Sequence, residues 1–252
     1  MSAGDPESEV IGAAGIVMAA GKGTRFASDI PKVMHQVAGR PMLAHVVKAG
    51  VAAGLEPLIV VIRPGMDVGN AADGAVTVNQ PPAGRGTAFA VEIGLTAVPC
   101  DIGTVVALYG DSPLVRPATV RGVINALQSA NAVAAIAWAD VPDPGAFGRV
   151  RLAEAGLVEG IVETADASPA DLALTTVNAG PAAFRASWLR RALPRVQPSP
   201  TSGERYLTQL VDLAIEDNER VAGYRITDLD ETIGCDDLER LAAADAAFRR
   251  RT

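Results

Sequence analysis

The sequence predicts an α/β protein with a mixed, mainly parallel sheet and helices on both of its faces. Short runs rich in Val and Ile alternate with longer stretches rich in Ala and Leu, which is the pattern of βαβ units. The short runs are almost continuously apolar, as in strands that helices cover on both sides. The 252 residues, 49% of them hydrophobic, are enough for one large domain with a substantial core.

Strands and helices alternate regularly in the first half of the chain. Apolar runs predict strands at residues 14–18, 58–62, 104–109 and 132–138. Stretches with helical periodicity predict helices between them at residues 41–53, 88–97 and 118–130. Every apolar run has the length of a strand rather than of a membrane span, so no association with a membrane is expected.

From residue 140 the pattern changes. After a turn cluster at 141–145, strand-like segments at 149–152 and 158–163 flank Glu154-Ala155-Gly156, which predicts a β-hairpin insertion. Residues 1–10 are polar and predict a flexible tail, so that residues 11–252 form a single domain. The remaining expected elements are a strand at 177–184, helices at 187–193 and 204–217, a strand at 221–226 and a closing helix from Asp237.

Charge and composition exclude several classes of protein. The chain carries 22 Lys and Arg residues against 29 Asp and Glu residues, a formal net charge of −7. Proteins that coat nucleic acid or anionic membranes need a net basic face, so neither partner is expected. Cys100 and Cys235 are too few for a disulfide framework and lack zinc-type spacing, which favours a cytoplasmic location. His35 and His45 have no ligand pattern around them, and we expect packing or surface positions for both.

The segment from Met18 to Lys32 is the most informative part of the sequence. It begins where the first expected strand ends and reads MAAGKGTRF, followed a few residues later by IPK. Small residues and glycines at a strand end allow phosphate oxygens to approach backbone N–H groups. Residues 18–40 carry four basic residues and one acidic residue, a net charge of +3. The spacing fits neither the P-loop nor GxGxxG. We expect a loop that binds a polyphosphate, with a plain glycine turn as the alternative.

Asp111 is the first candidate for a metal ligand. It lies two residues beyond the apolar run 104–109, at the carboxyl edge of the expected sheet, where ligands of open α/β folds bind. A carboxylate there suits Mg²⁺, which takes oxygen ligands from one or two carboxylates plus substrate phosphates. The alternative is a turn or helix-capping aspartate before Pro113. Asp236 precedes the closing helix, where it could simply be the residue that caps this helix.

Several short motifs, in order along the chain, resemble those of the sugar-phosphate nucleotidyltransferases. Residues 31–46 (PKVMHQVAGRPMLAHV) are especially similar to the uridylyltransferase domain of the bifunctional N-acetylglucosamine-1-phosphate uridylyltransferase/glucosamine-1-phosphate acetyltransferases. The other motifs are Ala19–Arg25, Gly86-Thr87-Ala88, Leu108–Leu114, Phe147–Val150, Gly160–Glu163 with Asp166-Ala167, Asn178-Ala179-Gly180, Gly203–Thr208 and Ile233–Asp236.

The resemblance implies a Rossmann-like fold of the nucleotide-diphospho-sugar transferase type, with roles for individual residues. Arg25, Lys32 and Asp111 are implied as catalytic, and Asp111 and Asp236 as ligands of a Mg²⁺ cofactor. The residues implied in nucleotide binding are Met18, Ala19, Ala20, Gly21, Gly23, Thr24, Arg25, Lys32, Gln80, Gly86 and Thr87. Those implied in sugar binding are Tyr109, Gly110, Gly148, Glu163, Asn178, Tyr206 and Thr208.

The main functional hypothesis is a Mg²⁺-dependent nucleotidyltransferase that forms a nucleotide sugar and pyrophosphate from a nucleoside triphosphate and a sugar 1-phosphate. UTP and N-acetylglucosamine 1-phosphate are the leading pair. Four places depart from the family's pattern: Gly84 or Arg85 stands where a second glutamine would read uracil beside Gln80, Thr164 replaces a lysine, Gln209 replaces an aspartate, and Asp236 replaces an asparagine. An enzyme for GTP, CTP or ATP, or for another sugar or cyclitol phosphate, is therefore the first alternative.

An alternative of a different class is a regulatory protein that binds a nucleotide with Mg²⁺ and has no turnover. Members of the resembled family continue into a left-handed β-helix that transfers acetyl groups and forms trimers, whereas this sequence ends at Thr252. We therefore expect no use of acetyl-CoA and no obligatory trimer. A monomer or a small homo-oligomer is the expected state.

Overall fold

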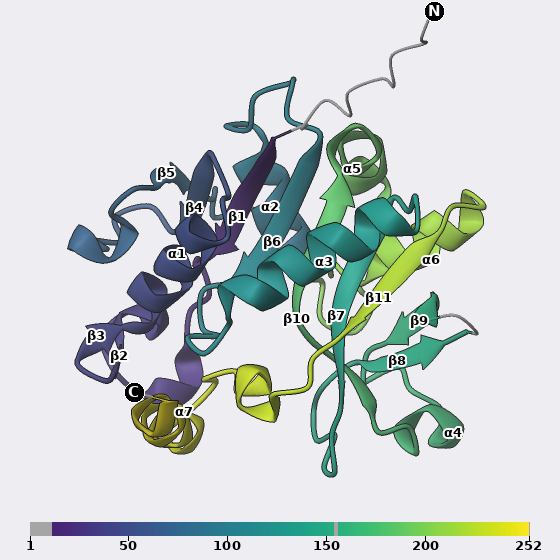
Figure 1. The fold of residues 1–252 in the computed structure, drawn as a ribbon. Helices are drawn as coiled ribbons and strands as arrows, with labels where there is room; N and C mark the ends of the chain where they lie inside the picture. Colours follow the sequence, from purple (N-terminus) through teal and green to yellow (C-terminus); the bar gives the residue numbers. More distant parts are fainter. Residues whose placement is uncertain (1–11, 154–155, 252) are drawn as a thin grey trace, which may run out of the picture.

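The computed structural model describes residues 12–153 and 156–251, so the expected tail at residues 1–10 lies outside the described residues. Within this part of the chain, nine strands form one mixed sheet (Figure 1). The strands are β1 (Ala13–Met18), β4 (Leu58–Ile62), β5 (Val76–Asn79), β6 (Thr104–Tyr109), β7 (Ala134–Asp140), β8 (Arg149–Leu152), β9 (Val158–Val162), β10 (Thr176–Arg185) and β11 (Val221–Arg225).

The strand order is β11-β7-β10-β6-β1-β4-β5, and the antiparallel hairpin β8–β9 joins the sheet through β10. Strands β6, β1, β4 and β5 run parallel, as do β7 and β11. Strand β10 is antiparallel to both of its neighbours, β6 and β7. The predicted mixed, mainly parallel sheet with a hairpin insertion is confirmed. The carboxyl ends of β1, β4, β5 and β6 consequently lie along one edge.

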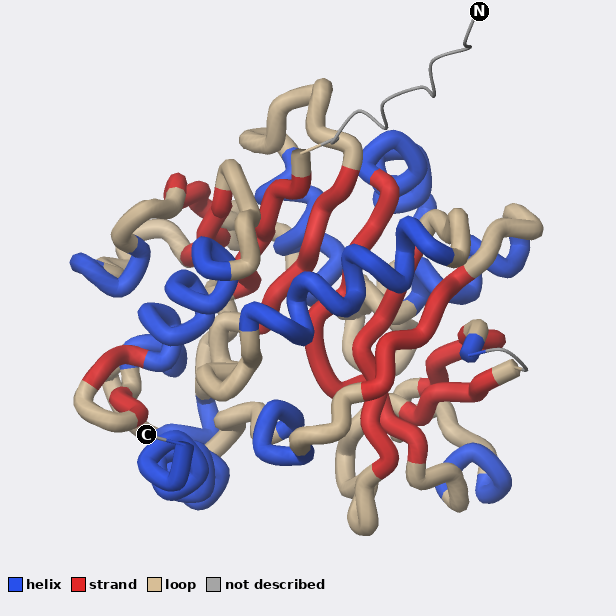
Figure 2. Tube along the Cα trace, viewed as in Figure 1, coloured by secondary structure: helices blue, strands red, loops and turns tan. Residues whose placement is uncertain are grey.

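Helices cover both faces of the sheet, as the blue layers on either side of the red strands in Figure 2 show. Helices α1 (Met42–Ala52) and α3 (Pro117–Ser129) cover one face, and α2 (Thr87–Leu95), α5 (Ala186–Ala192) and α6 (Gln209–Glu216) cover the other. Ile16 of β1 packs into the cluster with α2, α5 and α6, whereas the adjacent Val17 packs into the cluster with α1 and α3. This burial on both faces is the physical reason for the continuous apolar runs in the sequence.

Most predicted elements lie within two residues of those observed. The strand predicted at 132–138 is β7 at Ala134–Asp140, because the N–H of Ala132 donates a 2.9 Å hydrogen bond to the carbonyl of Leu127 and so completes the end of α3. The helix predicted at 204–217 is wrong over its first five residues, since α6 begins at Gln209. The N–H groups of Arg205 and Leu207 donate to the Arg85 carbonyl and the Thr87 hydroxyl instead of to a helical turn.

Several short elements were not predicted. They are a small antiparallel pair of strands, an edge strand and one four-residue helix: β2 (Gln36–Val37) with β3 (Arg40–Pro41), β5, and α4 (Pro169–Leu172). The 3₁₀ helices are η1 (Thr24–Phe26), η2 (Lys32–Met34), η3 (Gly69–Ala72), η5 (Leu193–Arg195) and η6 (Leu229–Thr232). Residues 154–155, in the predicted turn of the β8–β9 hairpin, lie outside the described residues.

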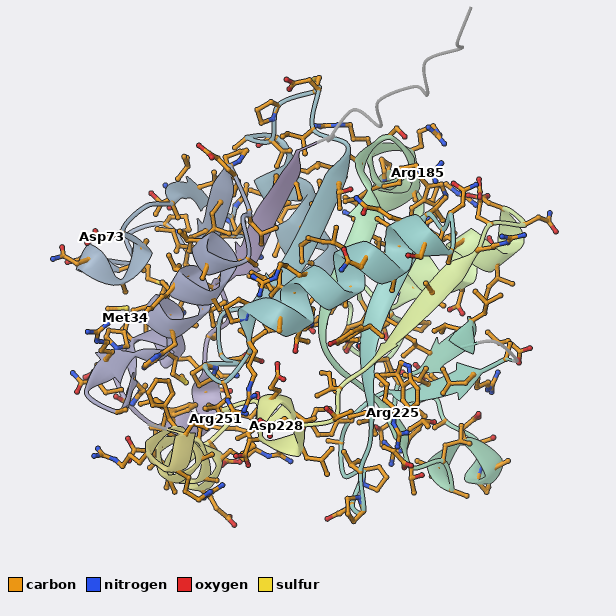
Figure 3. The ribbon with its side chains drawn as sticks, in the orientation of Figure 1. Met34, Asp73, Arg185, Arg225, Asp228 and Arg251 are labelled. Atoms are coloured by element: carbon orange, nitrogen blue, oxygen red, sulfur yellow. The ribbon has the colours of Figure 1, made fainter. Side chains whose placement is uncertain are left out.

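The closing helix α7 (Leu238–Arg251) lies beside the β2–β3 pair. The carboxylate of Asp245 accepts a 2.7 Å hydrogen bond from the N–H of Ala38. At the other end, Arg251 donates a 2.9 Å hydrogen bond to Asp228, which lies just before η6 (Figure 3). These contacts hold α7 against the β2–β3 pair and against the segment before η6. Across residues 12–153 and 156–251, no helix has the length and apolar character that crossing a membrane requires.

Candidate active site

The loop after β1 is held open by glycines. Gly23 has a φ of +61°, in the left-handed region that favours glycine, and a Cβ there would lie 2.6 Å from Cβ of Lys32. Gly21 has no atom within 4 Å of the place where a Cβ would stand, so its backbone faces open space. Met18 and Ala19 are buried at the base of the loop, whereas Thr24 and Arg25 are exposed. The loop thus offers backbone groups and a cation to a ligand at the sheet edge.

Gly110 brings the ends of β1 and β6 together. Its N–H donates a 3.1 Å hydrogen bond to the carbonyl of Met18, and an added Cβ would stand only 3.0 Å from the same oxygen. This close approach places Asp111, the next residue, beside the loop after β1. The carbonyl of Asp111 accepts a 2.9 Å hydrogen bond from the N–H of Cys235, which brings the turn before α7 to the same point.

Three charged side chains meet there. The ammonium of Lys32 lies 2.5 Å from Oδ2 of Asp111 and 2.7 Å from Oδ1 of Asp236, and Lys32 is only 9% exposed. Arg25 lies 3.8 Å from the other carboxylate oxygen of Asp236. Burial lowers the pKa of Lys32, but the charges of the two aspartates and its hydrogen bonds to them outweigh burial and raise the pKa above its ordinary value. The lysine is therefore fully charged at neutral pH.

The two aspartates fit a hard divalent cation. One oxygen from each carboxylate lies within 2.7 Å of the ammonium nitrogen of Lys32, so the two oxygens converge on one point, which a divalent cation could take only if this ammonium moved away. Mg²⁺ is commonly bound by one or two carboxylates, with phosphate oxygens and water as its other ligands. Among the described residues, no group of three or more His, Cys, Asp or Glu side chains gathers for metal binding. A cation between Asp111 and Asp236 would therefore depend on ligands from a bound substrate.

A second, polar group of side chains surrounds Glu163, next to the end of β9. Its Oε1 accepts a 2.7 Å hydrogen bond from the hydroxyl of Thr208, and a Cβ on Gly148 would stand 3.5 Å from its Oε2. The carbonyl of Gly148 accepts from the N–H of Asn178 at 2.9 Å. Burial, together with the charges of Glu163 and Asp111, raises the pKa of Tyr109 well above its ordinary value despite a hydrogen bond with Asn178. Tyr109 is consequently a neutral phenol.

The Gly86-Thr87 turn at the start of α2 lies against the segment that precedes α6. Gly86 has a φ of +99°, and a Cβ there would stand 2.3 Å from the carbonyl oxygen of Arg205. The N–H of Ala88 donates to that carbonyl at 2.9 Å, and the Thr87 hydroxyl accepts from the N–H of Leu207 at 2.8 Å. Glycine is required at this turn because only a residue without a side chain allows the two segments to touch.

The structure brings most of the predicted site residues into these groups, with two exceptions. The side-chain amide of Gln80 donates to the carbonyl of Gly84 at 3.2 Å, within its own loop. The hydroxyl of Tyr206 donates to Ser202 at 2.8 Å, also within its own loop, rather than to the group around Glu163. Sequence reasoning also gave no role to Arg205, although the structure places it between the two sides of the site. The one feature of the sequence that could have indicated a role for Arg205 is its position as a basic residue inside the Gly203–Thr208 motif.

Comparison with known proteins agrees with the resemblance predicted from the motifs. A family model described as a MobA-like NTP transferase domain matches residues 15–213. The chain is 40% identical over 250 residues to the bifunctional protein GlmU of Mycolicibacterium vanbaalenii, covering 95% of this chain and 50% of that protein. It is 37% identical over 244 residues to the bifunctional protein GlmU of Hyphomonas neptunium, covering 94% of this chain and 52% of that protein. The chain thus spans about half the length of the curated relatives it matches.

Solved structures share the fold at lower sequence identity. A UDP-glucose pyrophosphorylase in complex with UDP-glucose superposes with a TM-score of 0.75 at 17% identity, covering 96% of this chain and all of that one. A UTP-bound UGPase from Acinetobacter baumannii gives a TM-score of 0.72 at 21% identity, covering 96% of this chain and 94% of that one. These likenesses confirm the predicted type of nucleotide-diphospho-sugar transferase fold.

Proposed function

The chain belongs to the MobA-like NTP transferase domain family, and we propose that it transfers a nucleotidyl group from a nucleoside triphosphate to a sugar 1-phosphate with the help of Mg²⁺. One observation carries the proposal. Asp111 and Tyr109, two residues apart at the end of β6, belong to different groups of side chains: the charged group with Lys32, and the polar group with Glu163. A phosphate chain beside the first group and a sugar beside the second would meet at the end of this strand.

In the proposed reaction, a phosphate oxygen of the sugar 1-phosphate attacks the α-phosphorus of the nucleoside triphosphate in line. The new P–O bond forms as the bond between the α-phosphorus and the bridging oxygen breaks, and pyrophosphate leaves with the electron pair. The substrate phosphate is itself the nucleophile, so the protein needs to supply only positioning and charge neutralisation. We assign these tasks to the loop after β1 and to the polar group around Glu163.

Lys32 and Arg25 are the cations that would face the triphosphate. Negative charge moves onto the leaving pyrophosphate in the transition state, so a fixed cation there lowers the barrier more than it strengthens ground-state binding. Lys32 suits this task because it is buried at this edge of the sheet, and a cation held by Asp111 and Asp236 would release its ammonium from the two carboxylates to face the phosphates. When bound, Mg²⁺ would supply further neutralisation of the phosphate oxygens, and Asp111 and Asp236 would hold it.

Glu163, Asn178 and Thr208 would bind the sugar. A carboxylate and an amide can pair with vicinal hydroxyls or with an acetamido group. Thr208 donates to Glu163 and so fixes which carboxylate oxygen remains available. UTP and N-acetylglucosamine 1-phosphate are our leading substrates, because the bifunctional protein GlmU relatives resemble this chain over nearly its whole length.

An enzyme for another base is the second candidate. The observation that favours it is the hydrogen bond from Gln80 to Gly84, which occupies one N–H of the side-chain amide that would otherwise face the base. Arg85, exposed in the same loop, offers donors that suit the acceptor groups of guanine or cytosine. Neighbours of the same fold include a CMP:2-keto-3-deoxy-manno-octonic acid synthetase in complex with CTP.

A pyrophosphate-release assay separates these candidates. Each of the four nucleoside triphosphates is combined with N-acetylglucosamine 1-phosphate, glucose 1-phosphate and a cyclitol phosphate, in the presence of Mg²⁺. We expect release only when both substrates are present, with UTP and N-acetylglucosamine 1-phosphate the fastest pair. A faster reaction with another base would favour the second candidate. Binding of nucleotide without release from any acceptor would contradict the enzymatic proposal.

A further inference from the structure

The Gly86-Thr87 turn is connected to the polar group around Glu163 through the segment that contains Arg205. Its carbonyl accepts a 2.9 Å hydrogen bond from the N–H of Ala88 in the first turn of α2, and its own N–H donates to the carbonyl of Arg85 at 3.1 Å. Gly86 lies directly against this backbone. The turn that would bind the nucleotide and the segment that leads to Thr208 are therefore in contact along four consecutive residues, 85–88.

The Arg205 side chain fixes this contact to the body of the protein. Its guanidinium donates to the carbonyl of Val196 at 2.9 Å and also to the carbonyl of Leu193 in η5. It forms an ion pair with Glu92, one turn further along α2, and only 18% of the side chain is exposed. A planar guanidinium with several donors can hold three acceptors at once, which lysine cannot do with the same geometry. One side chain thus ties α2, η5 and the segment before α6 together.

The connection continues into the sugar side of the site. Leu207 donates to the Thr87 hydroxyl at 2.8 Å, and Thr208 donates to Glu163 at 2.7 Å. A ligand that orders the turn at 86–87 would therefore also order residues 205–208. A second ligand that needs Thr208 and Glu163 in place would then lose less conformational entropy on binding. The expected result is positive coupling between the two ligands, which by linkage is the same in both directions.

We propose that Arg205 is a positioning residue that couples nucleotide binding to sugar-phosphate binding through its ion pair with Glu92. The inference rests on the proposed function, because it takes the two sides of the site to bind a nucleotide and a sugar phosphate. It adds that their affinities depend on each other. In this role Arg205 would contact neither the nucleotide nor the sugar phosphate.

Calorimetric titration measures the coupling directly. The probe ligands are the non-reactive α,β-methylene analogue of UTP and N-acetylglucosamine 1-phosphate, each titrated with and without the other. In the wild-type protein we expect the analogue to tighten sugar-phosphate binding by roughly five- to fifty-fold. In Arg205→Met and in Glu92→Gln this factor should fall to about two or less, while the affinity for the analogue alone changes by less than about threefold.

Arg190→Met is the matched control. Arg190 also binds backbone carbonyls at α2, donating to Leu95 at 3.3 Å and to Val98 at 2.9 Å, but these acceptors lie at and beyond the other end of the helix. We expect this variant to keep the wild-type coupling factor. Glu92→Gln keeps the inference testable if Arg205→Met fails to fold, because Glu92 is half-exposed and the change is isosteric.

The outcomes separate the inference from the function on which it rests. If the wild type binds both probes and the coupling factor is unchanged in folded Arg205→Met and Glu92→Gln, the inference is overturned and the proposed function stands. A coupling factor of one in the wild-type protein also overturns the inference. If the wild type binds neither probe, the proposed function fails, and the inference fails with it.

Discussion

The ammonium of Lys32 lies 2.5 Å from Oδ2 of Asp111, although the two residues are 79 positions apart in the chain. The contact exists because β1 and β6 are neighbours in the parallel sheet and Gly110 allows their ends to approach closely. Asp236 reaches the same ammonium from the turn before α7. A site for a polyphosphate with a divalent cation therefore depends on three segments that only the folded sheet edge brings together.

Replacing Asp111 by Asn should abolish turnover while leaving the fold intact. The change removes a charge that would hold the cation, and it alters no core contact, so we expect pyrophosphate release to fall by at least roughly a hundredfold. The midpoint of thermal unfolding should change by only a few degrees. Asp101→Asn, in an exposed loop, is the control and should retain full activity. Normal release from Asp111→Asn would contradict the assignment.

Replacing Asp236 by Asn tests whether the second carboxylate strengthens cation binding. A neutral amide keeps an oxygen ligand but removes one negative charge, so we expect the affinity for Mn²⁺ of the protein saturated with the α,β-methylene analogue of UTP to fall by roughly tenfold. Electron paramagnetic resonance counts free and bound Mn²⁺ without requiring turnover. Asp237→Asn, whose carboxylate accepts from the N–H of Arg240 at the start of α7, is the neighbouring control. Equal Mn²⁺ affinity in Asp236→Asn and the wild type would show that the charge of Asp236 does not contribute to cation binding.

Replacing Thr208 by Val should affect the sugar side selectively. Valine keeps the shape of the side chain but removes the hydroxyl that donates to Glu163 at 2.7 Å. We expect the KM for the sugar 1-phosphate to rise by about tenfold, because a lost hydrogen bond to a charged group costs about 1.5 kcal/mol or more. The KM for the nucleoside triphosphate should change little. Thr208→Ser keeps the donor and should remain close to the wild type, and a rise in both KM values would contradict a role confined to the sugar.

The sequence predicted the sheet and the charged group well, because both follow from local patterns. Strands that are buried on both faces have continuous apolar sequences. A carboxylate just after such a strand lies at the edge of the sheet where ligands bind. Asp111 was singled out in this way, whereas the roles of Lys32 and Asp236 were implied by the resemblance, and the structure brings the three side chains together. Edge strand β5 was not predicted, because Val76 is 53% exposed and its four residues have no continuous apolar pattern.

The segment at 204–208 shows what local patterns cannot predict. Its residues have helical character, yet their N–H groups bond to Arg85 and Thr87, more than a hundred positions earlier in the chain. The hydrogen bonds of Gln80 and Tyr206 within their own loops likewise depend on backbone geometry that no spacing reveals. Long-range pairing decided the conformation of the segment at 204–208, and local loop geometry decided the partners of Gln80 and Tyr206, so motif position alone was insufficient for either.

Replacing Gly86 by Ala should destabilise the protein and weaken nucleotide binding. The added Cβ would stand 2.3 Å from the carbonyl of Arg205, at a φ of +99° that alanine rarely adopts. We expect the free energy of unfolding to fall by about 2 kcal/mol or more, measured by urea denaturation. Gly160→Ala is the control, because the nearest atom to its added Cβ lies 4.0 Å away. A variant as stable as the control would show that residues 85–88 and 205 separate easily.

The buried imidazole of His45 should make stability depend on pH. Its Nε2 lies 2.8 Å from the carbonyl of Val37, and its ring packs 4.5 Å from that of Phe248 in α7. Burial lowers the pKa of His45 below its ordinary value of 6.5, and the charges of Arg40 and Lys48 add to this effect against the bond to Val37. Between the lowered pKa and 6.5, the unfolded chain binds a proton that the folded chain does not. The free energy of unfolding therefore falls as the pH drops below about 6.5.

His45→Gln keeps an N–H donor for the Val37 carbonyl but cannot take up a proton. We expect it to be less stable than the wild type at pH 7.5, since glutamine packs less well against Phe248, and this difference should shrink as the pH falls to about 5.5. Urea denaturation at several pH values measures it, and the range stays above the ordinary pKa of carboxylates so that their titration does not obscure the result. A stability difference that is constant across this range would mean that His45 has the same pKa in the folded and unfolded chain.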